Sequence, residues 1–183
     1  MRLFIAFILF SMTTLPAYSQ IVVLGSGLAR DCYEAAKDDT SFTRGGIETC
    51  TKALSHTPLK RENRLATYVN RGILYMRSEN YPEAQSDYDR ALKIKPDNEH
   101  ALINRGASYV FQGEYDSAME SLNKAIEVGS EQLYAAYYNR AVVHEIQGDL
   151  WAAYQDLQKS LELKPDYEMA LVQIERFVVE DES

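Results

Sequence analysis

The residues best placed to do chemistry are three asparagines, Asn70, Asn104 and Asn139, each followed by an arginine and then by glycine or alanine. A side-chain amide donates and accepts hydrogen bonds at the same time. A row of such amides therefore suits the backbone of an extended peptide, while apolar neighbours hold its side chains. The amides could instead only tie adjacent helices together. The sequence leaves both interpretations open, and the two can coexist.

The asparagines recur at spacings of 34 and 35 residues, a period typical of stacked helical hairpins. Other positions repeat with them. A large residue stands three positions after the small one, and a small residue twelve after it: Tyr75, Tyr109 and His144, then Ala84, Ala118 and Ala153. Such a unit cannot bury its apolar face alone and must stack on a neighbour, which gives a quasi-one-dimensional architecture.

This frame resembles the tetratricopeptide repeat family, whose pattern is a small residue, an aromatic, then Ala, an aromatic, Ala and a closing Pro. The first copy reads Gly72, Tyr75, Ala84, Tyr88, Ala91, Pro96. The second reads Gly106, Tyr109, Ala118, Leu122, Ala125 without a proline, and the third Ala141, His144, Ala153, Leu157, Ser160, Pro165. The resemblance covers residues 64–166 clearly. It implies an all-α, right-handed superhelix of antiparallel helix hairpins.

Three clear repeats, a divergent N-terminal repeat and a C-terminal capping helix are expected. The predicted helices span 28–37, 44–55, 65–78, 82–95, 99–112, 116–128, 134–147 and 150–163, with the cap ending near Val179 and an acidic, frayed end from Glu180. The predicted segments are a signal peptide at 1–19, the divergent repeat and a linker at 20–63, repeats at 64–98, 99–133 and 134–166, and the cap with its tail at 167–183.

A candidate binding surface follows from helical geometry, because residues at the Asn position and three, six and seven further on share one face of each first helix. The resemblance places that face on the concave side of the superhelix. The expected groove residues are Asn70, Ile73, Met76, Arg77, His100, Asn104, Ala107, Phe111, Tyr138, Asn139 and Val142. The expected function is an exported protein-interaction module that holds a peptide or partner protein there.

The alternative is a structural self-assembler, in which the cap presents Phe177, Val178 and Val179 to another copy. A homo-oligomer therefore remains possible.

The arginine after each asparagine predicts structure rather than function. Asp87 and Asp156 stand sixteen positions after Arg71 and Arg140, where an ion pair across the hairpin is expected, and Arg105 faces Ser121 in the same frame. Exposed pairs of this kind add little stability.

One subgroup of tetratricopeptide domains grips a C-terminal carboxylate with lysines, arginine and asparagines. The comparable positions here are Val69, Ile73, Asn104, Ala135 and Asn139. Only the middle asparagine fits, so that specificity is not predicted.

The N-terminus predicts export. Arg2, an apolar run over 3–10 and the small-residue site Ala17-Tyr18-Ser19 follow the order of a secretory signal peptide, with cleavage expected after Ser19. An uncleaved anchor is the alternative, but the apolar run is short for a bilayer and Pro16 interrupts it. A periplasmic or otherwise secreted chain without a stable membrane span is expected after cleavage.

Two cysteines, Cys32 and Cys50, fall one on each helix of the divergent first hairpin. A disulfide between them suits an oxidising compartment and would contribute on the order of 3 kcal/mol, largely by restricting the unfolded chain. Two buried free thiols are the alternative.

Charge and motifs exclude several function classes. The net charge is −8, and loss of residues 1–19 removes only Arg2 to leave −9, so nucleic acid is not expected as a partner. The one basic cluster, Lys60, Arg61 and Arg64, is interpreted as a solvated linker. The stretch 21–27 resembles a dinucleotide-binding turn, but Arg30 replaces its third glycine, and the stretch is interpreted as the loose start of the mature chain. No enzyme, cofactor or metal site is predicted.

Overall fold

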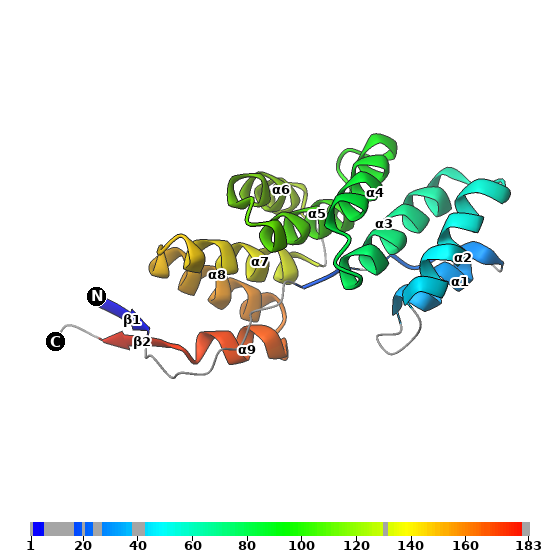
Figure 1. Ribbon diagram of the computed structural model, residues 1–183. Helices are drawn as coiled ribbons and strands as arrows, with labels where there is room; N and C mark the ends of the chain where they lie inside the picture. The colour runs from blue at the N-terminus through cyan, green and yellow to red at the C-terminus, as the bar shows by residue number, and fades with distance from the viewer. Residues whose placement is uncertain are drawn as a thin grey trace.

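Apart from a small two-stranded sheet, the chain folds into helices that follow one another as hairpins (Figure 1). A computed structural model describes residues 2–5, 17–19, 21–23, 27–37, 43–129 and 132–180. The helices are α1 (Leu28–Lys37), α2 (Thr43–His56), α3 (Arg61–Arg77), α4 (Tyr81–Ile94), α5 (Glu99–Gln112), α6 (Tyr115–Val128), α7 (Leu133–Ile146), α8 (Leu150–Leu163) and α9 (Glu168–Ile174). The strands are β1 (Arg2–Ile5) and β2 (Phe177–Glu180).

Each odd-numbered helix up to α7 packs on the even-numbered helix that follows it, and each hairpin packs on the next. The first helices α3, α5 and α7 also contact one another in that order. The predicted all-α stack of antiparallel hairpins is therefore confirmed, with predicted bounds within a residue or two over α4 to α8.

Small residues allow the two helices of a hairpin to approach closely. A Cβ placed on Gly72 would lie 2.4 Å from Cε1 of the fully buried Tyr88, and one on Gly106 would lie 2.7 Å from Cγ of Leu122. The side chains of Tyr88 and Leu122 therefore pack directly on the backbone of the glycine that each faces. Between helices, Gly113 adopts the left-handed conformation at φ 73°, which glycine accepts without a steric penalty.

The predicted linker before the third helix is wrong at its C-terminal end. Helix α3 begins at Arg61, so Arg61 and Arg64 belong to the helix rather than to a solvated connection. Both donate to backbone carbonyls of neighbouring helices, Arg61 to that of Ile94 in α4 and Arg64 to that of Leu54 in α2. The basic cluster thus joins neighbouring elements.

The predicted C-terminal cap is also wrong in part. Helix α9 ends at Ile174, and the chain continues as β2, which pairs antiparallel with β1 so that Arg2 lies opposite Glu180 and Ile5 opposite Phe177 (Figure 1). Glu180 is therefore in a strand; the rest of the predicted frayed end lies outside the described residues. Apolar β-branched residues at 178 and 179 favour a strand once a partner is available.

Phe177 is buried at 8 % exposure and packs on Tyr154 of α8, with ring centroids 6.0 Å apart. Phe177 is therefore covered by its own chain, whereas the self-assembly alternative needs this side chain to be exposed to another copy.

Candidate functional site

The three asparagines lie on the adjoining helices α3, α5 and α7, at equivalent positions of their hairpins. All three side chains are fully buried. We call this surface, with Asn70, Asn104 and Asn139 along its centre, the asparagine face. A buried amide needs hydrogen-bond partners, because leaving its donors and acceptor unpaired costs about 1–3 kcal/mol.

The partners come from the N-terminal part of the chain. The Ser19 N–H donates to Asn104 Oδ1 at 2.7 Å, and Asn104 Nδ2 donates to the Ser19 carbonyl at 2.6 Å. Ala17 makes the same pair with Asn139, at 2.8 Å and 3.1 Å. Each amide thus holds both polar backbone groups of one residue.

Ile21 completes the row. Its N–H donates to Asn70 Oδ1 at 3.3 Å and its carbonyl accepts from Asn70 Nδ2 at 2.9 Å. Residues 17, 19 and 21 are therefore held by α7, α5 and α3 in that order. This spacing is the period of an extended chain, which advances about 6.6 Å every two residues. Residues 17–19 and 21–23 lie in turn along α7, α5 and α3 toward α1 (Figure 1).

The held residues turn small side chains toward the helices. Ala17 is 7 % and Ser19 2 % exposed, and Ser19 Oγ lies 2.5 Å from Nδ1 of His100. Ala17 joins the apolar cluster that includes Val142 of α7. A side chain much larger than Ala or Ser at these two positions would need the helices to move.

Tyr18, the residue between Ala17 and Ser19, packs on an aromatic ring. Tyr18 stacks on Phe111 with centroids 6.4 Å apart, and Phe111 stacks on Tyr81 at 5.4 Å. Tyr18 and Ile21 pack against the buried cluster of α3 and α4 that includes Ile73 and Met76. The face therefore combines amides for the backbone with apolar and aromatic surface for side chains.

His100 is a titratable group in contact with the held segment, through Ser19 Oγ. Burial lowers the pKa of its imidazole, Glu99 opposes that shift, and Lys95 adds to it. The neutral ring is therefore favoured, and a neutral imidazole can accept the Ser19 hydroxyl proton or donate to its oxygen.

The structure gathers the other expected groove residues near this face but buries most of them. Ile73, Met76, Ala107, Tyr138 and Val142 are each at most 3 % exposed. Arg77 and Phe111 are partly buried. The Tyr138 ring meets Tyr167 edge-on at 5.5 Å, and burial raises the pKa of its hydroxyl to about 12. Binding of a partner by these residues stays a prediction.

The predicted ion pairs across the hairpins are confirmed. Arg71 makes two hydrogen bonds to Asp87, at 2.6 Å and 2.7 Å, and Arg140 makes two to Asp156, at 2.7 Å and 2.8 Å. Arg105 donates to Ser121 Oγ at 3.2 Å, as its frame predicts.

The two arginine–aspartate pairs differ in burial. Asp87 is 1 % exposed and its burial raises the pKa of the carboxyl, against the effect of Arg71. In the more exposed pair, the hydrogen bond that Arg140 donates to Asp156 raises the pKa of the Arg140 guanidinium. Both pairs fix hairpin geometry behind the asparagine face.

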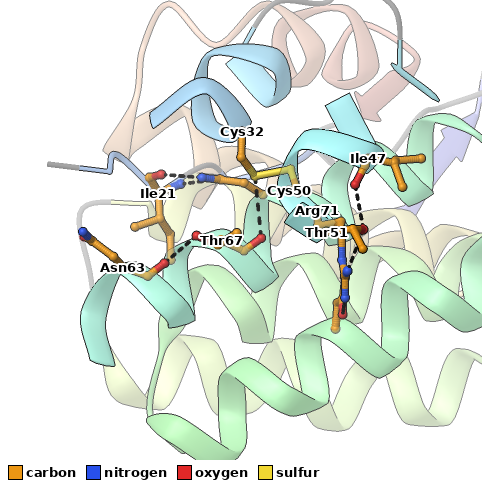
Figure 2. The surroundings of a disulfide bond; sticks show 10 residues. Ile21, Cys32, Ile47, Cys50, Thr51, Asn63, Thr67 and Arg71 are labelled. Atoms are coloured by element: carbon orange, nitrogen blue, oxygen red, sulfur yellow. Dashed lines mark hydrogen bonds and ion pairs between the residues drawn. A yellow bond between two sulfur atoms is a disulfide. The ribbon is translucent and has the colours of Figure 1, made fainter. Parts of the chain in front are cut away.

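The predicted disulfide joins Cys32 of α1 to Cys50 of α2, with Cα atoms 4.8 Å apart (Figure 2). Around it, Arg71 of α3 donates to Thr51 Oγ1 of α2 at 2.9 Å, so the bridged hairpin is hydrogen-bonded to the first clear repeat. Ile21 lies in the same region, bonded to α3 (Figure 2).

The sequence analysis missed that residues 17–19 and Ile21 lie along the asparagine face. The expected loose start is wrong for 21–23, because Ile21 is hydrogen-bonded and Val23 is 1 % exposed. The rest of the turn-like stretch, residues 24–26, lies outside the described residues. Alternation of small or apolar residues at 17, 19, 21 and 23 was the available signal for an extended segment.

The described residues also bear on whether the chain could cross a membrane or hold a metal ion. Within the described part of the chain, no helix has both the length and the apolar character needed to cross a bilayer. Among those same residues, no group of three or more His, Cys, Asp or Glu side chains is arranged to hold a metal ion.

Comparison with protein families decides the classification. Two profiles described as tetratricopeptide repeat match residues 63–131 and residues 134–167, which together make up more than half of the chain. The chain belongs to the tetratricopeptide repeat family. The matched regions include all three asparagines and, apart from the first residues of α3 and α7, the helices α3 to α8.

Among curated proteins, this tetratricopeptide repeat chain is 27 % identical over 169 residues to Superkiller complex protein 3 of Homo sapiens. The match covers 84 % of this chain and 11 % of the human protein. The chain is 34 % identical over 102 residues to Tetratricopeptide repeat protein 6 of Homo sapiens, covering 54 % of this chain and 19 % of the relative. The chain thus spans about a tenth of the length of the first curated relatives it matches.

Solved structures agree on the fold. MamA from Desulfovibrio magneticus RS-1 superposes with a TM-score of 0.62 at 16 % identity, over 81 % of this chain and 82 % of that one. The second TPR domain of human RPAP3, solved in complex with the HSP70 peptide SGPTIEEVD, gives a TM-score of 0.58 at 21 % identity, over 64 % of this chain and 97 % of that one. These likenesses show that the chain shares the fold of other tetratricopeptide repeat domains.

Proposed function

We propose that the asparagine face is a groove that binds an extended segment of a partner protein through its backbone. One observation carries this proposal: each of Asn70, Asn104 and Asn139 holds the N–H and the carbonyl of a single residue in an extended strand. Because these bonds go to backbone groups, they favour conformation over sequence. Sequence preference would come from the side-chain surface around Phe111 and His100.

We propose further that the chain is exported and loses residues 1–19. Support comes from the order of Arg2, the apolar run and Ala17-Tyr18-Ser19, and from the Cys32–Cys50 disulfide, which suits a periplasmic or other secretory compartment. A carboxylate-gripping mode like that of some tetratricopeptide domains is not proposed, since Val69, Ile73 and Ala135 supply no cation.

The test is peptide display against the chain with a C-terminal tag, produced in a bacterium and recovered from the envelope, with its N-terminus determined by mass spectrometry. The variant is Asn104→Ala with Asn139→Ala. The matched control is Asn80→Ala, at an exposed helix start that makes no side-chain cap.

We expect the unaltered and control chains to enrich the same extended peptides, and the double variant to lose at least about tenfold in affinity because two amide pairs are gone. Equal enrichment by all three would remove the asparagine face as the binding site. A mass that still includes residues 1–19 would contradict processing.

A further inference from the structure

The segment 17–19 has the features of a bound peptide rather than of a packed linker. The backbone N–H and carbonyl of Ala17 and of Ser19 are all hydrogen-bonded to side-chain amides of α7 and α5, with donor–acceptor distances between 2.6 Å and 3.1 Å. These contacts join residues 122 and 85 positions apart in the sequence. The same two amides are therefore occupied whenever this segment is in place.

The expected processing site lies within this contact. Cleavage after Ser19 would detach Ala17 and Ser19 and leave Ile21 attached to Asn70. Val23, which is buried with Ala29, Ala53 and Ala66, would keep that remaining end in position. Processing would thus uncover Asn104 and Asn139, and leave the Asn70 end of the face filled.

The uncovered site has a definite chemistry. It needs an extended strand that runs from the third clear repeat toward the first. Two small side chains, one of them hydrogen-bonded to His100, would flank a residue that packs on Phe111. A long side chain at either small position would meet helices that already bury Ala17 and Ser19 almost completely. An aromatic between them would repeat the stack made by Tyr18.

We infer that residues 17–19 are an intramolecular pseudoligand: they fill the site of an extended small–aromatic–small peptide, and cleavage after Ser19 opens that site. This inference rests on the proposed function, because it names the ligand class of the same groove. Since a tethered segment competes at a high effective concentration, the unprocessed chain would bind such a peptide weakly.

The experiment uses the full chain, made in vitro so that residues 1–19 stay attached. Ala17→Pro with Ser19→Pro removes the two N–H groups that donate to Asn139 and Asn104 and releases the segment without altering the helices. Val22→Pro is the matched control, three residues beyond the segment at a position whose side chain is 55 % exposed. The probe is a fluorescently labelled peptide of residues 13–19, followed by anisotropy.

We expect the released chain to bind the probe at least about tenfold more tightly than the unaltered and Val22→Pro chains. Adding Asn104→Ala to the released chain should weaken binding about tenfold, and Asn80→Ala should not. In the unaltered chain, the amides of Ala17 and Ser19 should exchange hydrogen slowly, and Asn104→Ala should accelerate Ser19.

Exchange of these amides at the rate of a free chain would overturn the inference, as would equal probe affinity for released and unaltered chains. The two proposals fail differently. If displayed peptides bind the unaltered and released chains equally well, the groove binds peptides but the segment does not block it. If the amides are protected and the released chain binds neither the probe nor any displayed peptide, the ligand class and the proposed function both fall.

Discussion

At the scale of single residues, two adjacent side chains of each repeat contact different parts of the molecule. The asparagine of the Asn-Arg phrase faces the extended segment, and the arginine that follows turns to the second helix of its hairpin. Adjacent positions on a helix point about 100° apart, so neighbours in the sequence necessarily serve different surfaces. The arginine pairs then differ in energy according to their burial.

Neutralising Asp87 should be the most damaging of three matched substitutions. Asp87→Asn leaves the Arg71 guanidinium, which is 8 % exposed, without its counter-charge, and loss of one partner of a buried pair costs about 3–5 kcal/mol. Asp156→Asn should cost less, about 1–3 kcal/mol, because the Arg140 side chain is 22 % exposed. Urea unfolding followed by circular dichroism measures both.

Asp89→Asn serves as the control, since Asp89 bonds Arg105 from a side chain that is 49 % exposed and should change the free energy of unfolding by less than about 1 kcal/mol. Equal effects of the three substitutions would show that burial does not set the strength of these pairs.

At the scale of the helix hairpin, the contact between the small residue and its facing side chain sets how closely two helices pack. Tyr88 lies against Gly72, whereas in the third repeat Ala141 and Leu157 take these positions and both are buried. Alanine thus accompanies the smaller leucine. The second repeat pairs a glycine, Gly106, with Leu122, so a leucine is compatible with either small residue, whereas we expect the larger Tyr88 ring to need glycine as compensation.

Gly72→Ala should therefore destabilise the chain, because its Cβ would meet the Tyr88 ring at 2.4 Å. Overpacking costs about 1–3 kcal/mol, partly offset by the roughly 1 kcal/mol higher helix propensity of alanine. In a double-mutant cycle with Tyr88→Leu, we expect a favourable coupling of about 0.5–3 kcal/mol. Thermal and urea unfolding of the four chains measures it, and additive effects would contradict compensation.

At the scale of the whole molecule, the N-terminal part of the chain links elements that a simple stack would leave apart. Strand β1 pairs with β2 beyond α9, and Ala17, Ser19 and Ile21 are hydrogen-bonded to the first helices of three hairpins. In a linear array, by contrast, each unit contacts only its neighbours. The disulfide acts locally, within the hairpin of α1 and α2.

Reduction of Cys32–Cys50 should consequently destabilise one end of the molecule. We expect a loss of about 3 kcal/mol for the α1–α2 hairpin, with faster amide exchange there and little change in α5 to α8, because stability in stacked repeats is nearly a sum of neighbour contacts. Hydrogen exchange with and without reductant measures this distribution. A uniform increase along the chain would show instead that the stack unfolds as one unit.

The repeat, its helices and the interior of each hairpin could all be predicted from the sequence. Regular spacing of Gly72, Gly106 and Ala141, with their facing residues, suffices because helix packing repeats the same local contacts. The arginine–aspartate pairs and the disulfide followed from the same frame, since both partners lie within one hairpin.

Only the tertiary structure decided what the asparagines face and where the chain ends go. Ser19 meets Asn104 across 85 positions, and Arg2 meets Glu180, and no local pattern specifies contacts of such separation. The alternation at 17, 19, 21 and 23 indicates an extended chain but not its partner. That partner depends on three amides brought into line by the stacking of α3, α5 and α7, which exists only once the hairpins have packed.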